Sequence, residues 1–300
     1  MKNIIKFFVR LFFKIIGEKN AKTLVVFIGK LLGADPSIIK ASFNQDSKNL
    51  LITVYQKIGI LNYGNEQVTG EYFVLENILK NIYNDEENIV FFDVGANNGN
   101  YSKLLRQFFK KPKIYAFEPF EKIYTSLVGN LSSLNINCIN KALGATVSKI
   151  NIYNDKNDEK SELVTIHKNS LDTLFQLKDI ETQEVQMISI DSFCFENKIN
   201  KIDFLKIDVE GSELEVLKGA KKLIEDNKIG IIQFEFNEFN IFAHVFLKDF
   251  YDILSQYNFY RIKNDGLIPI LKYDSFNEIF KYQNILAINK NMSVKENILC

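Results

Sequence analysis

Short apolar runs alternate with segments of helical periodicity from residue 87 onward, and this alternation restricts the fold more than any other feature of the chain. The predicted core strands cover residues 89–95, 113–119, 136–142, 204–208, 229–236 and 284–289. Most of these runs are apolar along their whole length, as in strands whose two faces are both buried. Such strands, separated by helices, predict an α/β fold with a mostly parallel sheet and helices on both faces.

Four of the predicted strands carry an acidic residue at or next to their carboxyl ends. These residues are Asp93, Glu118, Asp208 and Glu235. In an open α/β sheet, ligands bind beyond the carboxyl ends of the strands. We therefore expect the four carboxylates to line a single site.

The segment DVGANNG, at the end of the first predicted core strand, is the candidate cofactor loop. Gly95 and Gly99 allow the backbone to turn tightly and to approach a ligand. A dinucleotide loop has the pattern G-x-G-x-x-G, but positions 97 and 100 are both Asn here. Asp93 would repel a pyrophosphate and attract the positively charged methionyl end of S-adenosylmethionine. The loop therefore favours adenosylmethionine, and a turn that binds no ligand is the alternative.

Two further strand ends supply candidate cofactor contacts. Glu118 follows the loop by about 20 residues, the position from which an acid accepts the ribose hydroxyls. After the third strand, Asn140 and Lys141 are candidates for contacts on the adenine side. Tyr101, at the start of the helix that follows the loop, completes the predicted cofactor-binding set. A solvated strand end is the alternative for Glu118.

Five segments resemble, in order, the successive motifs of the FkbM family of methyltransferases: FFDVGANNGNYS, YAFEP, KALG, ISIDSF and FLKIDVEGSELEVLKGA. The resemblance extends from about residue 85 to residue 290. It implies a Rossmann-like class I methyltransferase fold with a mostly parallel seven-stranded sheet. It also implies S-adenosyl-L-methionine as the methyl donor and O-methylation of a sugar, a glycan or a secondary metabolite.

The same resemblance implies roles for individual residues. The cofactor site is formed by Asp93, Gly95, Asn97, Gly99 and Glu118. Asp208, Glu210 and Gly211 line the active centre, and Asp208 also belongs to the predicted cofactor contacts. The chain departs from the family at residues 161–164, which read SELV where a short Gly/Ser-containing segment is usual. We interpret the polar stretch 154–179 as a substrate-side insertion.

A sugar hydroxyl is a weak nucleophile, so a general base is expected. Asp208 is the first candidate, Glu210 and Glu235 follow, and His244 is the least favoured. Structural alternatives exist: Glu210 can orient Lys206 or cap the next helix, Glu235 can be a solvated strand end, and His244 can be a packed core residue. The three carboxylates can also gather a divalent metal, but our prediction is that the site holds none.

Composition limits the partners of the chain. The 37 basic and 37 acidic residues balance, which argues against a nucleic-acid partner. The three cysteines have no paired spacing, so they indicate neither a disulfide framework nor a zinc site and favour a cytoplasmic location. A small-molecule or glycan acceptor is the expected partner.

Residues 1–16 predict a basic amphipathic helix, because Lys2, Lys6, Arg10 and Lys14 recur every four residues beside apolar side chains. Such a helix suits peripheral contact with the inner face of a membrane, and the alternative is packing on the domain or in a homo-oligomer. It is too short and too charged to span a bilayer. We predict a helical appendage over 1–80, a methyltransferase domain over 81–290 and a tail over 291–300.

Other function classes use a similar sheet. A nicotinamide-dependent oxidoreductase would have the loop glycines that are missing here, whereas a catalytically silent module would bind adenosylmethionine without forming adenosylhomocysteine. An esterase is disfavoured because the segment Gly211-Ser212-Glu213 does not fit the G-x-S-x-G pattern of a nucleophile elbow.

Overall fold

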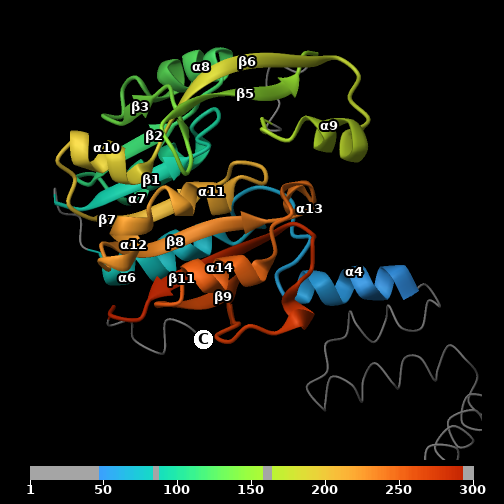
Figure 1. Ribbon diagram of the computed structural model, residues 1–300. Coiled ribbons are helices and arrows are strands. Elements are labelled where there is room, and N and C mark those ends of the chain that lie inside the picture. Colours follow the sequence, from blue (N-terminus) through green and yellow to red (C-terminus); the bar gives the residue numbers. More distant parts are fainter. Residues whose placement is uncertain (1–46, 84–87, 158–163, 293–300) are drawn as a thin grey trace, which may run out of the picture. The chain divides into compact units, whose positions relative to one another are not determined.

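The computed structural model describes residues 47–83, 88–157 and 164–292 (Figure 1). The chain divides into two compact units, Met1–Leu61 and Asn62–Cys300. The described part of the first unit contains helix α4 (Ser47–Lys57). The predicted amphipathic helix over 1–16 and the SELV departure, apart from Val164, lie outside the described residues, as does most of the C-terminal tail.

The second unit contains an eight-stranded sheet in the order β10-β9-β11-β8-β7-β1-β2-β3. The strands are β1 (Val90–Val94), β2 (Lys113–Phe117), β3 (Asn137–Ile139), β7 (Ile202–Ile207), β8 (Ile229–Phe236), β9 (Tyr257–Lys263), β10 (Gly266–Pro269) and β11 (Gln283–Asn289). The five strands from β3 to β8 are parallel, and β11, β9 and β10 are antiparallel to their neighbours. The predicted α/β fold with a mostly parallel sheet is confirmed.

The sheet has one strand more than the seven that were expected. The additional strand, β10, forms a tight hairpin with β9, in which Lys263 pairs with Gly266. The two connecting residues are Asn264 and Asp265, both of a type that favours tight turns. This signal was available in the sequence, although neither β9 nor β10 was among the predicted strands.

Helices cover both faces of the large sheet (Figure 1). One face carries α5 (Glu71–Phe73), the π-helical turn Val74–Leu79, α6 (Lys80–Ile82), α7 (Asn100–Phe108) and α8 (Glu121–Leu131). The other face carries α10 (Ile190–Glu196), α11 (Glu213–Lys218), α12 (Lys221–Glu225) and α14 (Leu247–Ile253). Among the described helices, none is long and apolar enough to cross a membrane.

Strand β1 shows why the core strands are apolar throughout. Phe91 packs into the hydrophobic core on one face of the sheet, and the next residue, Phe92, packs into the core on the other face. Successive side chains of a strand point to opposite faces, so a strand covered on both sides needs apolar residues at every position. Asp93, near the carboxyl end of this strand, is the polar exception, and it lies at the edge of the sheet where ligands bind.

A smaller sheet of three strands in the order β4-β6-β5 forms a second layer. Its strands are β4 (Ala142–Leu143), β5 (Ser148–Asp155) and β6 (Ile180–Ile188), and helix α9 (Lys168–Phe175) lies between β5 and β6 in the chain. Strands β5 and β6 therefore lie on either side of the polar stretch in the chain. In Figure 1 this layer extends over the end of the large sheet at which the parallel strands terminate.

Candidate active site

A cavity of about 930 Å³ lies at the carboxyl ends of four neighbouring parallel strands. Its lining includes one acidic residue from each strand: Glu118 after β2, Asp93 in β1, Asp208 after β7 and Glu235 in β8. The sheet order places these residues along one edge in that order. The volume is near the upper end of the ~300–1,000 Å³ typical of small-molecule sites. It is therefore sufficient for a cofactor and an acceptor.

Most of the predicted site residues line this cavity. Those that do are Asp93, Gly95, Asn97, Tyr101, Glu118, Lys141, Asp208, Glu210 and Glu235. Gly99, Asn140, Gly211 and His244 are not part of its lining.

His244 and Asn140 do not lie where the sequence interpretation placed them, as a candidate base and as a contact on the adenine side. His244 is an exposed residue with left-handed backbone (φ 54°) at the end of α13 (Phe239–Ala243), so it is neither a base in the cavity nor a packed core histidine. Asn140 donates its side-chain amide to the backbone carbonyls of Glu118 and Pro119 at 3.1 and 3.3 Å. Asn140 therefore supports the chain after β2 instead of lining the adenine side.

The two loop glycines are required by packing within the protein. Both have positive φ, 79° at Gly95 and 83° at Gly99. A Cβ atom at Gly95 would lie 1.8 Å from the carbonyl oxygen of Asp208, and one at Gly99 would lie 2.8 Å from Leu127 in α8. Gly95 thus permits close contact between the loop and the segment after β7, and Gly99 permits the contact with α8.

Gly95→Ala is expected to lower the free energy of unfolding by about 2–4 kcal/mol, because the new methyl group overlaps a backbone carbonyl and the φ angle is unfavourable. Urea denaturation measures this change. Gly129→Ala is the matched control: Gly129 is exposed in α8 with no atom near an added Cβ, so alanine should be neutral or slightly stabilising there. Equal stability of the two variants would contradict the packing argument.

Glu118 is tied to the cofactor loop. One carboxylate oxygen accepts the backbone N–H of Asn97 at 3.1 Å, and the other accepts that of Phe120 at 2.8 Å. The side chain is buried, and burial raises the pKa of Glu118 to about 7, although these two hydrogen bonds oppose the increase. The alternative of a solvated strand end is therefore wrong.

Asp93 is completely buried at the end of β1. Its Oδ2 accepts a hydrogen bond from the hydroxyl of Ser102 at 2.7 Å, whereas its Oδ1 has no hydrogen-bond partner among the described residues. Burial raises the pKa of Asp93, and the nearby charge of Lys206 opposes this increase. A buried acceptor without a partner next to a cavity fits a ligand that brings a cationic donor.

Lys206 is a buried residue of β7 that the sequence interpretation named only as a partner of Glu210. Its Nζ pairs with Asp208 Oδ2 at 2.8 Å and lies 5.1 Å from the centre of the Tyr101 ring. Burial alone would lower the pKa of Lys206, but the surrounding carboxylates, Asp208 first among them, outweigh it and raise the pKa. The available signal was a lysine between apolar residues, in the segment FLKI of this strand.

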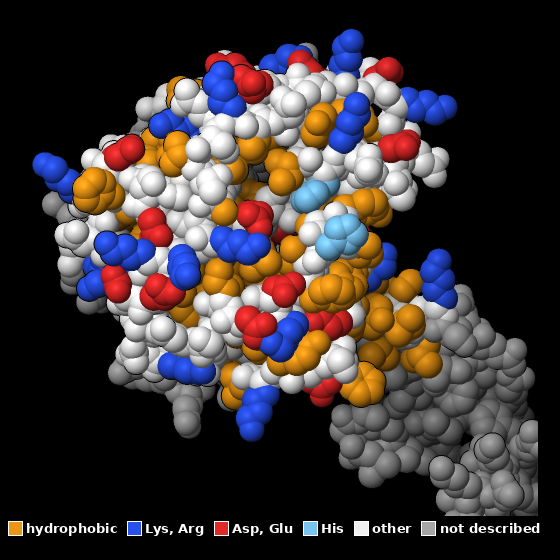
Figure 2. Space-filling view, viewed as in Figure 1, with side chains coloured by type: hydrophobic (Ala, Val, Ile, Leu, Met, Phe, Trp, Pro, Cys, Tyr) orange, Lys and Arg blue, Asp and Glu red, His pale blue; other side chains and the backbone are white. Residues whose placement is uncertain are grey.

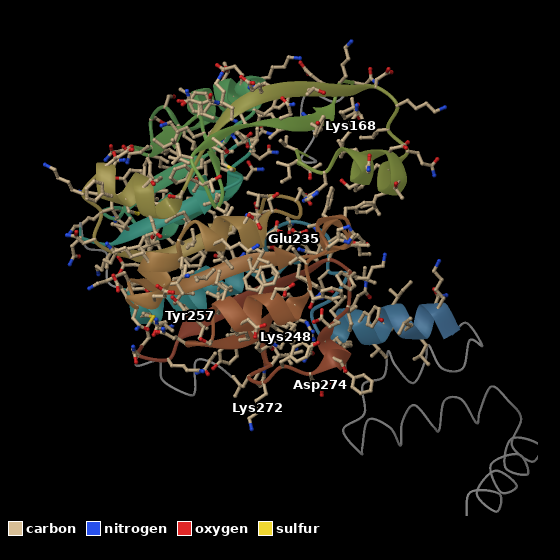
Figure 3. All side chains as sticks on the ribbon, in the orientation of Figure 1. Lys168, Glu235, Lys248, Tyr257, Lys272 and Asp274 are labelled. Atoms are coloured by element: carbon tan, nitrogen blue, oxygen red, sulfur yellow. The ribbon has the colours of Figure 1, made fainter. Side chains whose placement is uncertain are left out.

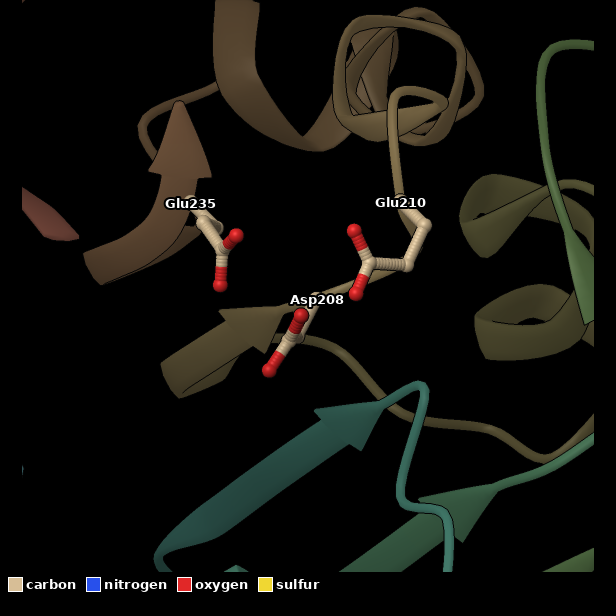
Figure 4. A group of neighbouring side chains, drawn as sticks. All are labelled: Asp208, Glu210 and Glu235. Atoms are coloured by element: carbon tan, nitrogen blue, oxygen red, sulfur yellow. The ribbon is translucent and has the colours of Figure 1, made fainter. Parts of the chain in front are cut away.

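Asp208, the ion-pair partner of Lys206, is one of three carboxylates that lie close together. One oxygen each of Asp208, Glu210 and Glu235 lies within 4.8 Å of the others, and the three side chains point toward one another (Figure 4). The side-chain amide of Asn237 donates to Glu210 at 3.2 Å and to Glu235. Burial raises the pKa of Glu235 well above its usual range, and the charges of Asp208 and Glu210 add to this effect. Such a group is a proton acceptor and offers oxygen ligands for a divalent cation.

The loop between β7 and α11 is held by Glu213, a residue that the sequence interpretation did not single out. Glu213 accepts the backbone N–H groups of Val209 and Gly211 at 3.1 Å each. The side chain of Glu210, from the same loop, lines the cavity and belongs to the carboxylate group.

The small sheet and the segment beside it form one wall of the cavity. The hydroxyl of Thr165 donates to the backbone carbonyl of Glu210 at 2.8 Å, and the ring of Phe175 stacks on that of Phe239 at 5.8 Å. Figure 3 shows Glu235 on the large sheet below the layer that carries Lys168. In Figure 2 hydrophobic side chains surround both histidines on the same face. The polar stretch thus contributes an apolar wall to the cavity.

Residues 93–261, more than half of the chain, match the Methyltransferase FkbM domain family. The chain belongs to this family. It is therefore an S-adenosylmethionine-dependent methyltransferase, and the resemblance noted in the sequence is confirmed.

Two curated relatives and one solved structure illustrate the similarity. The 2-O-methyltransferase NoeI of Sinorhizobium fredii is 22% identical over 59% of this chain and 75% of its own length. The hexuronic acid methyltransferase AglP of Haloferax volcanii is 28% identical over 57% of this chain and 63% of its own length. The plantazolicin methyltransferase BpumL, solved with SAH, is 10% identical with a TM-score of 0.41, covering 85% of this chain and 95% of that chain.

Proposed function

We propose that this methyltransferase transfers a methyl group to a hydroxyl oxygen of a sugar, in a glycan or a small glycoside. The observation that supports this most is the buried Glu235 beside Asp208 and Glu210, in the part of the cavity farthest along the sheet edge from Glu118. A hydroxyl needs a proton acceptor when it attacks a methyl group, and this carboxylate group supplies one. The printed names of NoeI and AglP, which concern a 2-O position and a hexuronic acid, agree with a sugar acceptor.

The residues of the cavity fit adenosylmethionine. Glu118 would hold the ribose hydroxyls, the loop from Gly95 to Asn97 would support the ligand, and the buried Oδ1 of Asp93 would face its cationic end. When bound, the cofactor supplies a methyl group on a positively charged sulfur. The chain aligns the acceptor with that group in a largely buried cavity, which is where much of the acceleration of such a displacement arises.

Glu235 is our choice for the general base, in place of Asp208. Asp208 forms an ion pair with the ammonium of Lys206 at 2.8 Å, so its carboxylate is already engaged. Glu235 is buried and its pKa is raised, and a carboxylate with a raised pKa is the stronger proton acceptor. Asn237 would orient Glu235 and Glu210 through its hydrogen bonds to both.

A silent binding module is the competing function, and it would never form adenosylhomocysteine with any acceptor.

Peripheral membrane contact through residues 1–16 and self-association are further proposals that rest on the sequence pattern.

The charges of the cavity predict which acceptors are preferred. Lys141, Lys206 and Lys281 are the cationic residues in the described lining, and two of them are engaged, Lys206 with Asp208 and Lys281 with Glu238. An acceptor carboxylate near the three acids would lack a counter-charge. We expect a neutral hexoside to be methylated with a kcat/KM at least about tenfold higher than that of the matching hexuronic acid. The initial rates of adenosylhomocysteine formation with each acceptor measure this ratio.

Repeating the measurement in EDTA and in Mg²⁺ shows whether the acceptor preference is set by the carboxylates alone or by a divalent cation bound to them. Preference for the neutral sugar in EDTA supports the acidic acceptor region. A preference for the hexuronic acid that requires Mg²⁺ would contradict it and would assign a divalent cation to the three carboxylates. A panel of neutral, amino and acidic sugars that yields no adenosylhomocysteine would contradict the proposed acceptor class.

A further inference from the structure

Glu71 is a cavity residue from outside the family-matched region. It begins α5, before β1, whereas the family match begins at residue 93. The preceding residue, Gly70, has φ 85°, and a Cβ atom there would lie 2.2 Å from the carbonyl oxygen of Lys263 in β9. The segment that carries Glu71 is therefore packed closely on the large sheet and is part of the same compact unit.

The carboxylate of Glu71 has a defined position. Oε1 accepts a hydrogen bond from the side-chain amide of Gln233 at 3.1 Å and lies 4.0 Å from the ammonium of Lys206. Oε2 accepts the hydroxyl of Thr69 at 3.0 Å. The side chain is 13% exposed and lines the cavity. Its oxygens are held in place by neutral donors and retain capacity for a further donor, because a carboxylate has about four acceptor sites.

Carboxylates outnumber cations at this end of the cavity. Glu71, Asp93 and Asp208 all act on the charge of Lys206, which is the one lysine that they share. Burial raises the pKa of both Glu71 and Asp93, and Asp93 Oδ1 has no hydrogen-bond partner among the described residues. Buried carboxylates without enough positive charge favour a ligand that brings a cation.

The order of the strands indicates which part of the cofactor lies here. Glu118, the predicted ribose ligand, is at the end of β2, and the sheet continues through β1 to β7 and β8. A cofactor with its ribose at β2 and its methyl group near the acids of β7 and β8 has its methionyl end close to β1 and β7. Lys206, which lies 4.0 Å from Glu71, belongs to β7, and its register partner Asp93 belongs to β1.

We propose that Glu71, together with Asp93, binds the α-ammonium group of adenosylmethionine. The inference rests on the proposed function, since it requires that this cavity binds the cofactor. Glu71 is then a cofactor-binding residue contributed by the segment before the family-matched region, and it determines affinity for ligands that carry the amino-acid end.

Calorimetric titration with two ligands tests the assignment. Adenosylhomocysteine carries the ammonium group, and 5′-methylthioadenosine has the same nucleoside and sulfur without the amino-acid end. Glu71→Gln keeps the shape and the acceptor for Thr69 while removing the charge. We expect it to weaken adenosylhomocysteine binding by about tenfold or more and to leave methylthioadenosine binding within about twofold. Glu76→Gln, an exposed change nearby, should alter neither.

Three results are decisive. Unchanged affinity for adenosylhomocysteine, or equal loss for both ligands, would overturn the role of Glu71. If Glu71→Gln does not fold, Glu71→Asp takes its place, with a smaller loss confined to adenosylhomocysteine expected and a loss shared by both ligands contradictory. Failure of the unaltered protein to bind either ligand would instead refute the proposed cofactor site and with it the proposed function.

Discussion

Asp93→Ala is expected to weaken binding of S-adenosylhomocysteine by at least about 30-fold. The substitution removes a completely buried carboxylate, one oxygen of which has no hydrogen-bond partner among the described residues, from the end of β1. Removing one partner of a buried, charged hydrogen bond costs about 2–5 kcal/mol, which corresponds to a loss of this size. Calorimetric titration at neutral pH provides the measurement.

The ionisation of Asp93 adds a pH dependence. Burial raises the pKa of Asp93, and only the ionised form attracts a cationic ligand. Affinity should therefore fall with decreasing pH, beginning above the range usual for an aspartate. Asp93→Asn should show a smaller pH dependence, and the part that remains comes from Glu71 and Glu118, whose pKa values burial also raises. Asp252→Ala, an exposed change in a surface ion pair, is the control for the loss of an acid. An Asp93→Ala variant that binds as tightly as the unaltered protein would refute the loop assignment.

Glu235→Gln is expected to lower kcat by about 10²–10⁴-fold while the affinity for adenosylhomocysteine stays within a few-fold. The glutamine cannot accept the acceptor's proton, but it retains nearly the same volume in a buried position. Glu235 acts as a base only when ionised, and its pKa is raised. The rate of the unaltered enzyme should therefore increase with pH until the pH exceeds that pKa.

Rate profiles against pH distinguish Glu235 from the other candidate base. The alkaline increase should be absent in Glu235→Gln and present in Glu225→Gln, a change in an exposed ion pair on α12. Asp208→Asn should retain this pH dependence even if its rate is low. Asp208 forms an ion pair with the ammonium of Lys206 and is not the group that accepts the proton in this proposal. If the increase of the rate with pH is lost in Asp208→Asn and retained in Glu235→Gln, Asp208 is the general base.

The sequence by itself predicted the parts of the site that depend on local order. Apolar runs followed by acids predicted the parallel strands and brought Asp93, Glu118, Asp208 and Glu235 to one edge, because the ends of parallel strands meet there. The spacing of Gly95 and Gly99 predicted the tight turn, since few other residues adopt positive φ. These features are encoded within short segments, so they can be recognised without the fold.

Contacts between distant segments were decided by the tertiary structure. The carboxylate of Glu71 lies near Lys206, and Thr165 holds the backbone of Glu210, although these pairs are far apart in the chain. No local pattern marks such pairs, because their proximity depends on how helices and the second sheet pack on the first. Burial is also a property of the packed molecule, and it sets the raised pKa of Glu235. The strands and their shared ligand edge were therefore readable from the sequence, whereas the strand order and the charge environment of the site depend on packing.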